Sequence, residues 1–328
     1  MSDFKGIEIT DVLGLSQPLT KLVETVSCGV GKLYEPTHIR RLAKAKAEEM
    51  KVISDTVADN LHLPISYQNG EIGIDVADAN GLVQRAQNRF LFQEMKKQQN
   101  IEAVIATAYT ELDNEEEISS KAVDEDWVSS FFDFVANVSN EQMQILWGKV
   151  LAGEVKEPDS FSIRTLDILR KLTQKDAICF AEIIPLVLKC PGDRAATFYD
   201  YFIPGSFFEK SHLMKKCGID FPSIVRLDEA RLVSSNAMIS VGDVLEPKQS
   251  IVFEGAFSSF EVRNLGEKDV EMYHSAYVFT EAGKELLPVI SVLQSKKAPE
   301  WYLREFAESL MKTSVEDCKN RDLEIAFF

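Results

Sequence analysis

The polar residues between positions 159 and 167 are the first place in this sequence to look for chemistry. Asp159, Arg164, Thr165 and Asp167 bring two carboxylates, a guanidinium and a hydroxyl into a short stretch. Catalysis by such a set needs a nucleophile with a base in hydrogen-bonding reach. The surrounding residues 140–180 contain no histidine, no GxSxG motif and no glycine-rich phosphate loop. We therefore expect helix caps and solvated faces here, no catalytic residues, and a protein that is not an enzyme.

Cysteines and histidines do not form a recognisable metal motif. The five cysteines and four histidines are scattered, and no two cysteines form a CxxC pair. Only His212 and Cys217 approach ligand spacing, and two ligands cannot complete a tetrahedral zinc site. We expect neither a metal nor a cofactor, and the odd number of cysteines favours reduced thiols.

The chain is acidic as a whole and basic in one segment. Its formal net charge of −16 repels a polyanion on average. Residues 32–51 are the exception, and a nucleic acid or another anion could bind there. The candidate anion contacts are Lys32, Arg40, Arg41, Lys44 and Lys46. Nucleic-acid binding therefore stays an alternative that the overall charge disfavours.

An apolar helix face near the N-terminus is the second candidate contact surface. Helical spacing is kept by Leu19, Leu22, Val23 and Val26. If this face packs on its own domain, it is core. If it docks on an anionic membrane beside the basic segment 32–51, it is a peripheral anchor. Both interpretations stay open.

Helical periodicity dominates residues 82–190. Residues 82–112 contain neither glycine nor proline, and we expect one long helix with a kink or a change of face near Asn100. The residues before it, 61–81, have the composition of a connecting segment. Further apolar stripes at helical spacing are formed by Val128, Phe131, Phe132, Val135, Met143, Leu146, Trp147, Val150, Leu151, Leu166, Leu169 and Leu172.

Hydroxyl and acidic residues mark the expected helix starts. Two pairs have the spacing of a capping box, Ser139 with Gln142 and Thr173 with Asp176. Between them, a helix should end near Gly153 or before Pro158, and the next should be capped by Ser160 or Ser162.

The segment from Asp124 to Phe180, DEDWVSSFFDFVANVSNEQMQILWGKVLAGEVKEPDSFSIRTLDILRKLTQKDAICF, resembles an uncharacterised bacterial family known as domain of unknown function 2806. Residues 14–49 and 277–289 are similar to the opening and closing parts of that family, and the chain is more loosely similar to abortive-infection alpha-type proteins. The resemblance supplies no catalytic residues. It implies a bacterial accessory-genome protein tied to phage defence.

The C-terminal half predicts a different module. A helix near Ile224, strands over 250–264 and 270–279, and a helix capped by Thr280 follow one another in the order of a winged-helix domain. Gly283 would let this last helix pack closely. Residues 206–290 carry nine Lys and Arg against thirteen Asp and Glu, the reverse of the balance in a DNA reader. We therefore favour a protein contact over duplex DNA.

Together these patterns predict a mainly α chain, with a helical domain over 1–190 and a winged-helix-like α+β domain with a C-terminal helix over 191–328. The acidic start and the lack of a long apolar run predict a cytoplasmic protein. The leading hypothesis is a non-enzymatic protein that binds or senses another macromolecule, most simply a protein, in phage defence. The alternatives are a membrane-acting abortive-infection effector and nucleic-acid binding through 32–51, and self-association as a homo-oligomer also stays open.

Overall fold

The computed structural model describes residues 16–30, 65–68, 71–74, 82–189, 201–204, 219–255, 259–291, 300–313 and 323–327. The candidate anion contacts in the basic segment 32–51 lie outside these residues. The chain divides into two compact units, residues 1–170 and 171–328. The boundary expected from sequence, after residue 190, would instead assign the helix at 174–183 to the first unit.

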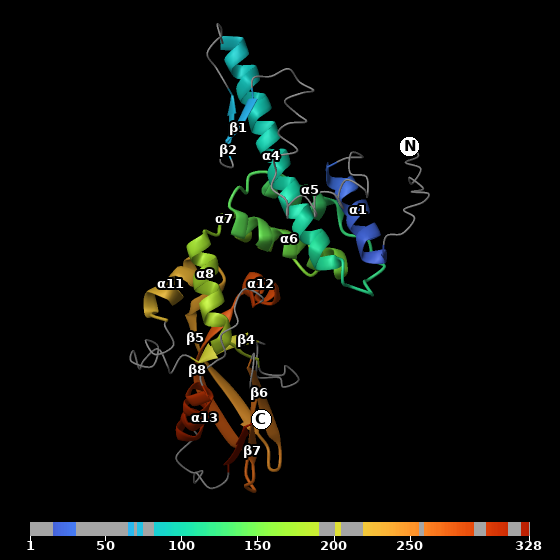
Figure 1. The fold of residues 1–328 in the computed structure, drawn as a ribbon. Helices are drawn as coiled ribbons and strands as arrows, with labels where there is room; N and C mark the ends of the chain where they lie inside the picture. Colours follow the sequence, from blue (N-terminus) through green and yellow to red (C-terminus); the bar gives the residue numbers. More distant parts are fainter. Residues whose placement is uncertain are drawn as a thin grey trace, which may run out of the picture. The chain divides into compact units, whose positions relative to one another are not determined.

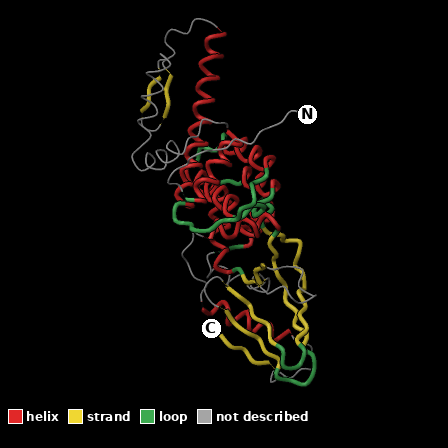
Figure 2. Tube along the Cα trace, turned by 90° about the vertical axis from the view of Figure 1, so that its right-hand side faces the viewer, coloured by secondary structure: helices red, strands yellow, loops and turns green. Residues whose placement is uncertain are grey.

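Among its described residues, the first unit is helical apart from one small hairpin (Figures 1 and 2). The helices described in this unit are α1 (Gln17–Val30), the long helix α4 (Leu82–Leu112), α5 (Glu125–Val135), α6 (Glu141–Lys156) and α7 (Ile163–Lys171). The hairpin pairs β1 (Ile65–Gln68) with β2 (Glu71–Ile74) in antiparallel register. It lies in a segment for which the sequence predicts only a connection.

Aromatic residues fill the centre of this bundle. Trp147 on α6 is fully buried, and its ring meets those of Phe131 and Phe134 edge-on at centroid distances of 5.4 and 6.4 Å. The apolar stripes predicted on α5, α6 and α7 are buried throughout, which confirms them. Gly148 permits the close approach of α6 to α4, because a Cβ there would lie 2.4 Å from the Cβ of Thr107.

Helix α4 changes environment at Asn100. Residues 101–109 are buried, whereas those described from Arg85 to Gln99 are exposed or half-buried. The Asn100 amide donates to the carbonyl oxygen of Ala136 at 2.8 Å and accepts from Gln144 at 3.2 Å. The change expected near this residue is therefore the point where α4 enters the bundle.

Three helix caps test the sequence patterns. Thr173 and Asp176 form the predicted capping box, and Ser162 caps α7 by accepting from the backbone N–H of Thr165 at 3.2 Å. The predicted box at Ser139 is wrong. Asn140 caps α6 instead, accepting from Met143 N at 3.1 Å, and the Ser139 hydroxyl accepts from Asn100 at 3.4 Å. Helix α6 also continues past Gly153 and ends before Pro158.

The second unit is built on a seven-stranded antiparallel sheet in the order β5-β8-β4-β3-β6-β7-β9. Its strands are β3 (Leu188–Lys189), β4 (Tyr201–Pro204), β5 (Val233–Leu245), β6 (Ser250–Gly255), β7 (Ser259–Asn264), β8 (Val270–Phe279) and β9 (Leu323–Phe327). Its helices are α8 (Gln174–Ile183), α11 (Phe221–Glu229), α12 (Glu281–Ser291) and α13 (Glu300–Thr313), with a 3-10 turn at Ile184–Leu186.

The strands β6, β7 and β8 confirm the predicted ones, whereas β5 lies between the helix near Ile224 and residue 250, where the sequence predicts no strand. The helix that begins at the Thr173 capping box ends at Ile183, before the end of the stretch 82–190 in which helical periodicity dominates. Thr280 caps α12 through the N–H of Gly283 at 3.0 Å, as predicted. The close packing expected at Gly283 is also present, because a Cβ there would lie 2.0 Å from the carbonyl oxygen of Leu232.

Helix α13 is anchored to the sheet by aromatic contacts. The ring of Phe306 lies 6.0, 5.6 and 5.9 Å from those of Phe202, Phe253 and Phe260. On the same helix, the Tyr302 hydroxyl donates to the carbonyl oxygen of Leu186 at 2.7 Å. These contacts give the second unit a core of its own.

Candidate functional site

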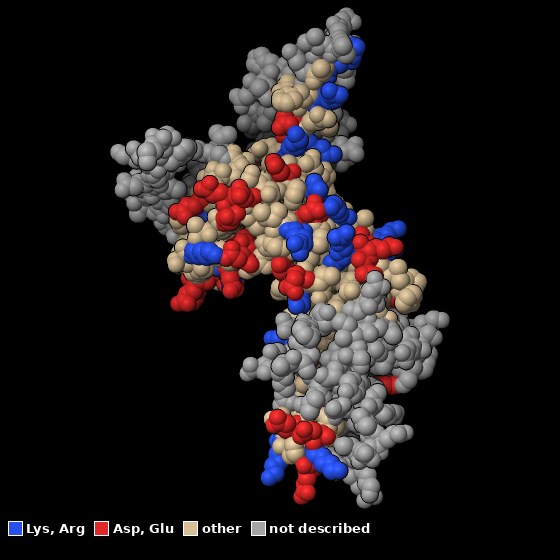
Figure 3. Space-filling view, turned by 180° about the vertical axis from the view of Figure 1, so that it is seen from behind, with Lys and Arg blue, Asp and Glu red and all other residues tan. Residues whose placement is uncertain are grey.

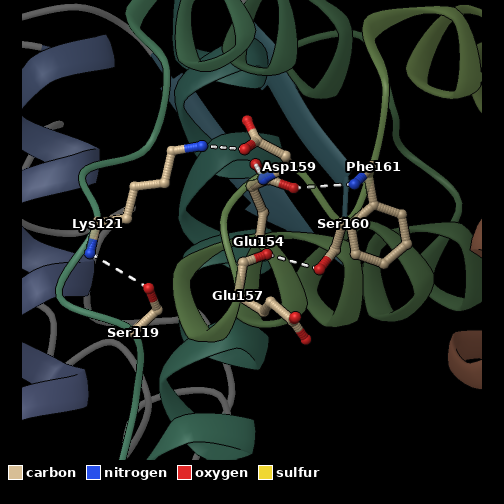
Figure 4. A network of polar contacts seen from close by, with 7 residues as sticks. All are labelled: Ser119, Lys121, Glu154, Glu157, Asp159, Ser160 and Phe161. Carbon is tan, nitrogen blue, oxygen red and sulfur yellow. Dashed lines mark hydrogen bonds and ion pairs between the residues drawn. The ribbon is translucent and has the colours of Figure 1, made fainter.

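A buried carboxylate organises the loop between α6 and α7. Glu154 is 1% exposed. One carboxylate oxygen accepts from the backbone N–H of Asp159 at 2.7 Å and the other from that of Phe161 at 3.0 Å (Figure 4). Burial raises the pKa of Glu154 above its usual value, and the backbone hydrogen bonds oppose that rise. The side chain therefore clamps the returning loop.

The loop itself is held in a conformation that needs such support. Asp159 has a φ of 73°, in the left-handed region that most side chains avoid. The indole N–H of Trp127, on α5, donates to the carbonyl oxygen of Phe161 at 2.7 Å. The Ser160 hydroxyl donates to the carbonyl oxygen of Glu157 at 2.6 Å. Four separate hydrogen bonds thus fix residues 159–161, and their donors and acceptors are already satisfied by the fold.

Two lysines surround this clamp. Lys121 pairs with the Asp159 carboxylate across the loop (Figure 4). Both side chains are largely exposed, so the pair contributes little to stability. Lys21, on α1, donates to the carbonyl oxygen of Ser119 at 2.9 Å. Burial lowers the pKa of Lys21, although the charge of Glu154 acts in the opposite direction.

Three of the four polar residues singled out in the sequence have separate partners, and the fourth is exposed. Asp159 pairs with Lys121, and Asp167 pairs with Arg170 at 2.8 Å one turn away. Thr165 is buried, and its hydroxyl lies 3.1 Å from that of Ser162 at the start of α7. Arg164 is exposed. The contacts of Asp159, Thr165 and Asp167 are those of helix caps and polar surfaces, so these three residues have local structural roles.

The apolar face of α1 lies inside the first unit. Its four candidate contact residues have exposed fractions of 4, 0, 5 and 0% for Leu19, Leu22, Val23 and Val26. Helix α1 packs against α5 near Gly29, where a Cβ would lie 2.2 Å from the ring of Phe132. In this structure the face is therefore core. It could reach a membrane or a partner only if α1 left the bundle.

Helix length and the placement of His, Cys, Asp and Glu in the described residues bear on membrane spanning and metal binding. None of the helices there combines the length and apolar character needed to cross a membrane. Nor does any group of three His, Cys, Asp or Glu side chains gather as metal ligands in that part of the chain. Of the cysteines described there, Cys28 is exposed and Cys179 is buried, both as free thiols.

The second unit contains a pocket of mixed polar and apolar lining that the sequence patterns did not indicate. Its volume is about 380 Å³, and its polar lining comes from Lys189, Tyr201, Glu254 and Lys284. The Lys189 ammonium lies 5.9 Å from the centroid of the Tyr201 ring. Lys284 is paired with Glu281 at 3.0 Å. These four polar residues come from β3, β4, β6 and α12, so no single stretch of sequence carries a signal for this pocket.

Helices α8 and α11 present exposed apolar side chains on adjoining elements. Phe221 is 57% exposed on α11 and Ile178 is 49% exposed on α8. The two helices are joined by a contact from Cys179 to the carbonyl oxygen of Ser223 at 3.6 Å. A second link pairs Arg226 with Asp176 at 3.3 Å, and the contacts with Thr173 and Arg226 outweigh burial to lower the pKa of Asp176. We call the outer side of these helices the α8–α11 surface.

A model of the family described as protein of unknown function (DUF2806) matches residues 84–305, well over half of the chain. The chain belongs to the DUF2806 family. The match includes the segments 124–180 and 277–289, whose resemblance to this family is confirmed, and begins after the segment 14–49. Searches of curated proteins and of solved structures returned no match. The looser resemblance to abortive-infection alpha-type proteins stays an expectation.

Proposed function

We propose that this DUF2806 protein is a non-enzymatic, cytoplasmic protein that binds another protein through the α8–α11 surface. The observation that carries the proposal is the exposure of Phe221 and Ile178 on two adjoining helices of an acidic module. Large exposed aromatic and aliphatic side chains are typical anchors of protein interfaces. The helical first unit is the platform in this proposal, and no catalytic step is assigned to it.

The connectivity around α11 supports a winged-helix-like module. Strand β4 precedes α11, β5 follows it directly, and β8 lies between the two in the sheet. Leu245 pairs with Val270 and Val233 with Phe279, so β5 and β8 form a long antiparallel ribbon. In a winged-helix arrangement, this ribbon is the wing and α11 is the helix that contacts the partner. Along the chain, β6 and β7 lie between β5 and β8. They extend the sheet beyond the winged-helix pattern.

The charges on α11 favour a protein over DNA. Between Phe221 and Glu229, its only basic residue is Arg226, which is paired with Asp176. The same helix carries the carboxylates of Asp228 and Glu229. A helix that reads DNA contacts phosphates and base edges mainly with unpaired Arg, Lys, Asn and Gln. Helix α11 instead carries an exposed apolar residue, Phe221, and the acids Asp228 and Glu229. This combination suits a protein surface that carries some basic residues.

Site-specific photo-crosslinking tests this proposal without knowledge of the partner. A photoreactive phenylalanine analogue would replace Phe221 in cells of the source organism, and a matched control would carry it at Leu265, which is 56% exposed on a loop of the same unit. We expect discrete protein adducts at position 221 that are lost when Ile178→Asp is added. Adducts to nucleic acid alone, or the same proteins at both positions, would contradict the proposal.

A role in phage defence is part of this proposal and is supported by the sequence resemblance alone. It predicts that cells carrying the gene reduce phage plaque formation and that Phe221→Asp removes the protection. The Leu265→Asp variant is the control for a surface charge in the same unit. Equal plaque counts with and without the wild-type gene, across a broad phage panel, would remove the defence role and leave the binding proposal standing.

A further inference from the structure

The outer half of α4, residues 85–99, is rich in basic residues and lies outside the helical bundle. In Figures 1 and 2 this half of α4 extends beyond α1, α5 and α6. Arg85, Arg89 and Lys96 are exposed along it, whereas α4 becomes buried from Asn100 onward. Strand β2 contacts α4, but the exposed side of these outer turns gains little from burial.

The charges of this half are unbalanced in a chain whose net charge is −16. It carries four basic residues and one acid, Glu94. That acid is paired with Lys97 at 2.7 Å. The other three basic residues of this half, Arg85, Arg89 and Lys96, form no ion pair with the described part of the chain. Elsewhere in the first unit, four other basic side chains are paired with carboxylates, namely Lys121, Lys149, Lys156 and Arg170.

The three unpaired cations share one line along the helix. At 100° per residue, Arg85, Arg89 and Lys96 fall within about 40° of one another and span about 16 Å of helix axis. Glu94 falls on roughly the opposite side, and half-buried Phe92 flanks the line. Blue side chains follow this part of α4 in Figure 3. We call these three residues the α4 basic ridge.

We propose that the α4 basic ridge binds the phosphate backbone of a nucleic acid. Two of its three cations are arginines, whose planar guanidinium groups suit phosphate oxygens, and the neighbouring Phe92 offers a ring for base contact. A membrane helix would need a broad exposed apolar face opposite its charges, whereas, among the described residues, the side opposite the ridge carries one exposed apolar residue, Phe90, beside the ion pair of Glu94 and Lys97. The inference is independent of the proposed protein contact.

Fluorescence anisotropy with the full-length protein tests the ridge. The probes are labelled mixed-sequence oligonucleotides of about thirty nucleotides, as single-stranded DNA, duplex DNA and single-stranded RNA. The ridge variant is Arg85→Gln, Arg89→Gln and Lys96→Gln together. The control variant removes three positive charges elsewhere, by Lys156→Gln, Lys175→Gln and Lys268→Gln, all at exposed positions. Circular dichroism establishes that both variants keep the wild-type helix content.

The salt dependence gives a quantitative expectation. Three phosphate contacts correspond to a slope of log K against log salt of about −2.7 for duplex DNA and about −2 for a single strand. We expect the ridge variant to lose at least tenfold in affinity at about 50 mM salt and most of its slope. The control variant should lose much less.

Three results would overturn the inference. The first is wild-type protein that binds none of the three probes at low salt. The second is binding that the ridge and control variants weaken equally, which would leave only a general charge effect. The third is ridge-dependent flotation with anionic phosphatidylserine vesicles, or ridge-dependent self-association in sedimentation, without nucleic-acid binding.

Discussion

Replacing Glu154 by glutamine tests whether this carboxylate is the clamp of the α6–α7 loop. Its two oxygens accept the N–H groups of Asp159 and Phe161 at 2.7 and 3.0 Å. A glutamine has one acceptor oxygen and places a donor where the second acceptor was, so one buried N–H loses its partner. An unsatisfied buried donor costs about 1–3 kcal/mol. We expect Glu154→Gln to lower the free energy of unfolding by that amount, and Glu154→Ala by more.

The assay must report on the first unit alone. Trp127 and Trp147 lie in the first unit and Trp301 in the second, so urea titrations followed by tryptophan fluorescence in a Trp301→Phe background isolate the first transition. Glu157→Gln is the matched control, because it removes an exposed carboxylate three residues away and should change stability by less than about 0.5 kcal/mol. Equal, small effects of Glu154→Gln and Glu157→Gln would refute the clamp.

The difference in unfolding free energy between wild type and Glu154→Gln should change with pH in one direction. The pKa of Glu154 is raised in the folded protein, so the folded state holds this proton more tightly than the unfolded chain does. Its contribution to stability is therefore complete below the unfolded pKa, near 4.5, and falls as pH rises toward the folded pKa. Because glutamine does not titrate, the stability gap between wild type and Glu154→Gln should narrow as pH rises through that window. A gap that widens there would contradict the raised pKa.

The remaining predictions concern packing and caps. Leu22→Ala should cost about 2–5 kcal/mol, because Leu22 is fully buried, and an unchanged urea midpoint would show that α1 is not core. Gly283→Ala should unfold the second unit at a lower temperature in calorimetry, since its Cβ would lie 2.0 Å from the Leu232 carbonyl oxygen; an unchanged transition would contradict that contact. Asn140→Ala should cost about 1 kcal/mol in urea unfolding and Ser139→Ala clearly less, and the reverse order would restore the predicted capping box.

The helical faces were predictable because their signal is local. Val128, Phe131, Phe132 and Val135 repeat at the period of a helix, and a helix with such a stripe can bury it only on one side. All four are buried. Thr173 and Asp176 were likewise predictable, because both groups of a capping box lie within one turn. The Ser139 box failed because an equally good cap, Asn140, adjoins it and begins the helix one residue later.

The structural features that sequence patterns missed depend on contacts between residues that are not neighbours in one helix or strand. Residues 233–245 are mixed in polarity, and they form β5 because β8 supplies the antiparallel partner from Val270 onward. The role of Glu154 depends on a loop that returns its N–H groups to the carboxylate, and a lone acid near the end of a helix does not signal that geometry. The α4 basic ridge is an intermediate case, because its spacing is visible in sequence but its position outside the bundle is not.

The most direct test of the proposed protein contact is the affinity of a crosslinked partner for three purified proteins: wild type, Phe221→Ser and Leu265→Ser. Biolayer interferometry would give the three dissociation constants under one set of conditions. If Phe221 anchors the interface, its loss should weaken binding about 30-fold, corresponding to about 2 kcal/mol, while Leu265→Ser binds like wild type. Equal affinities for all three would show that the α8–α11 surface is not where the partner binds.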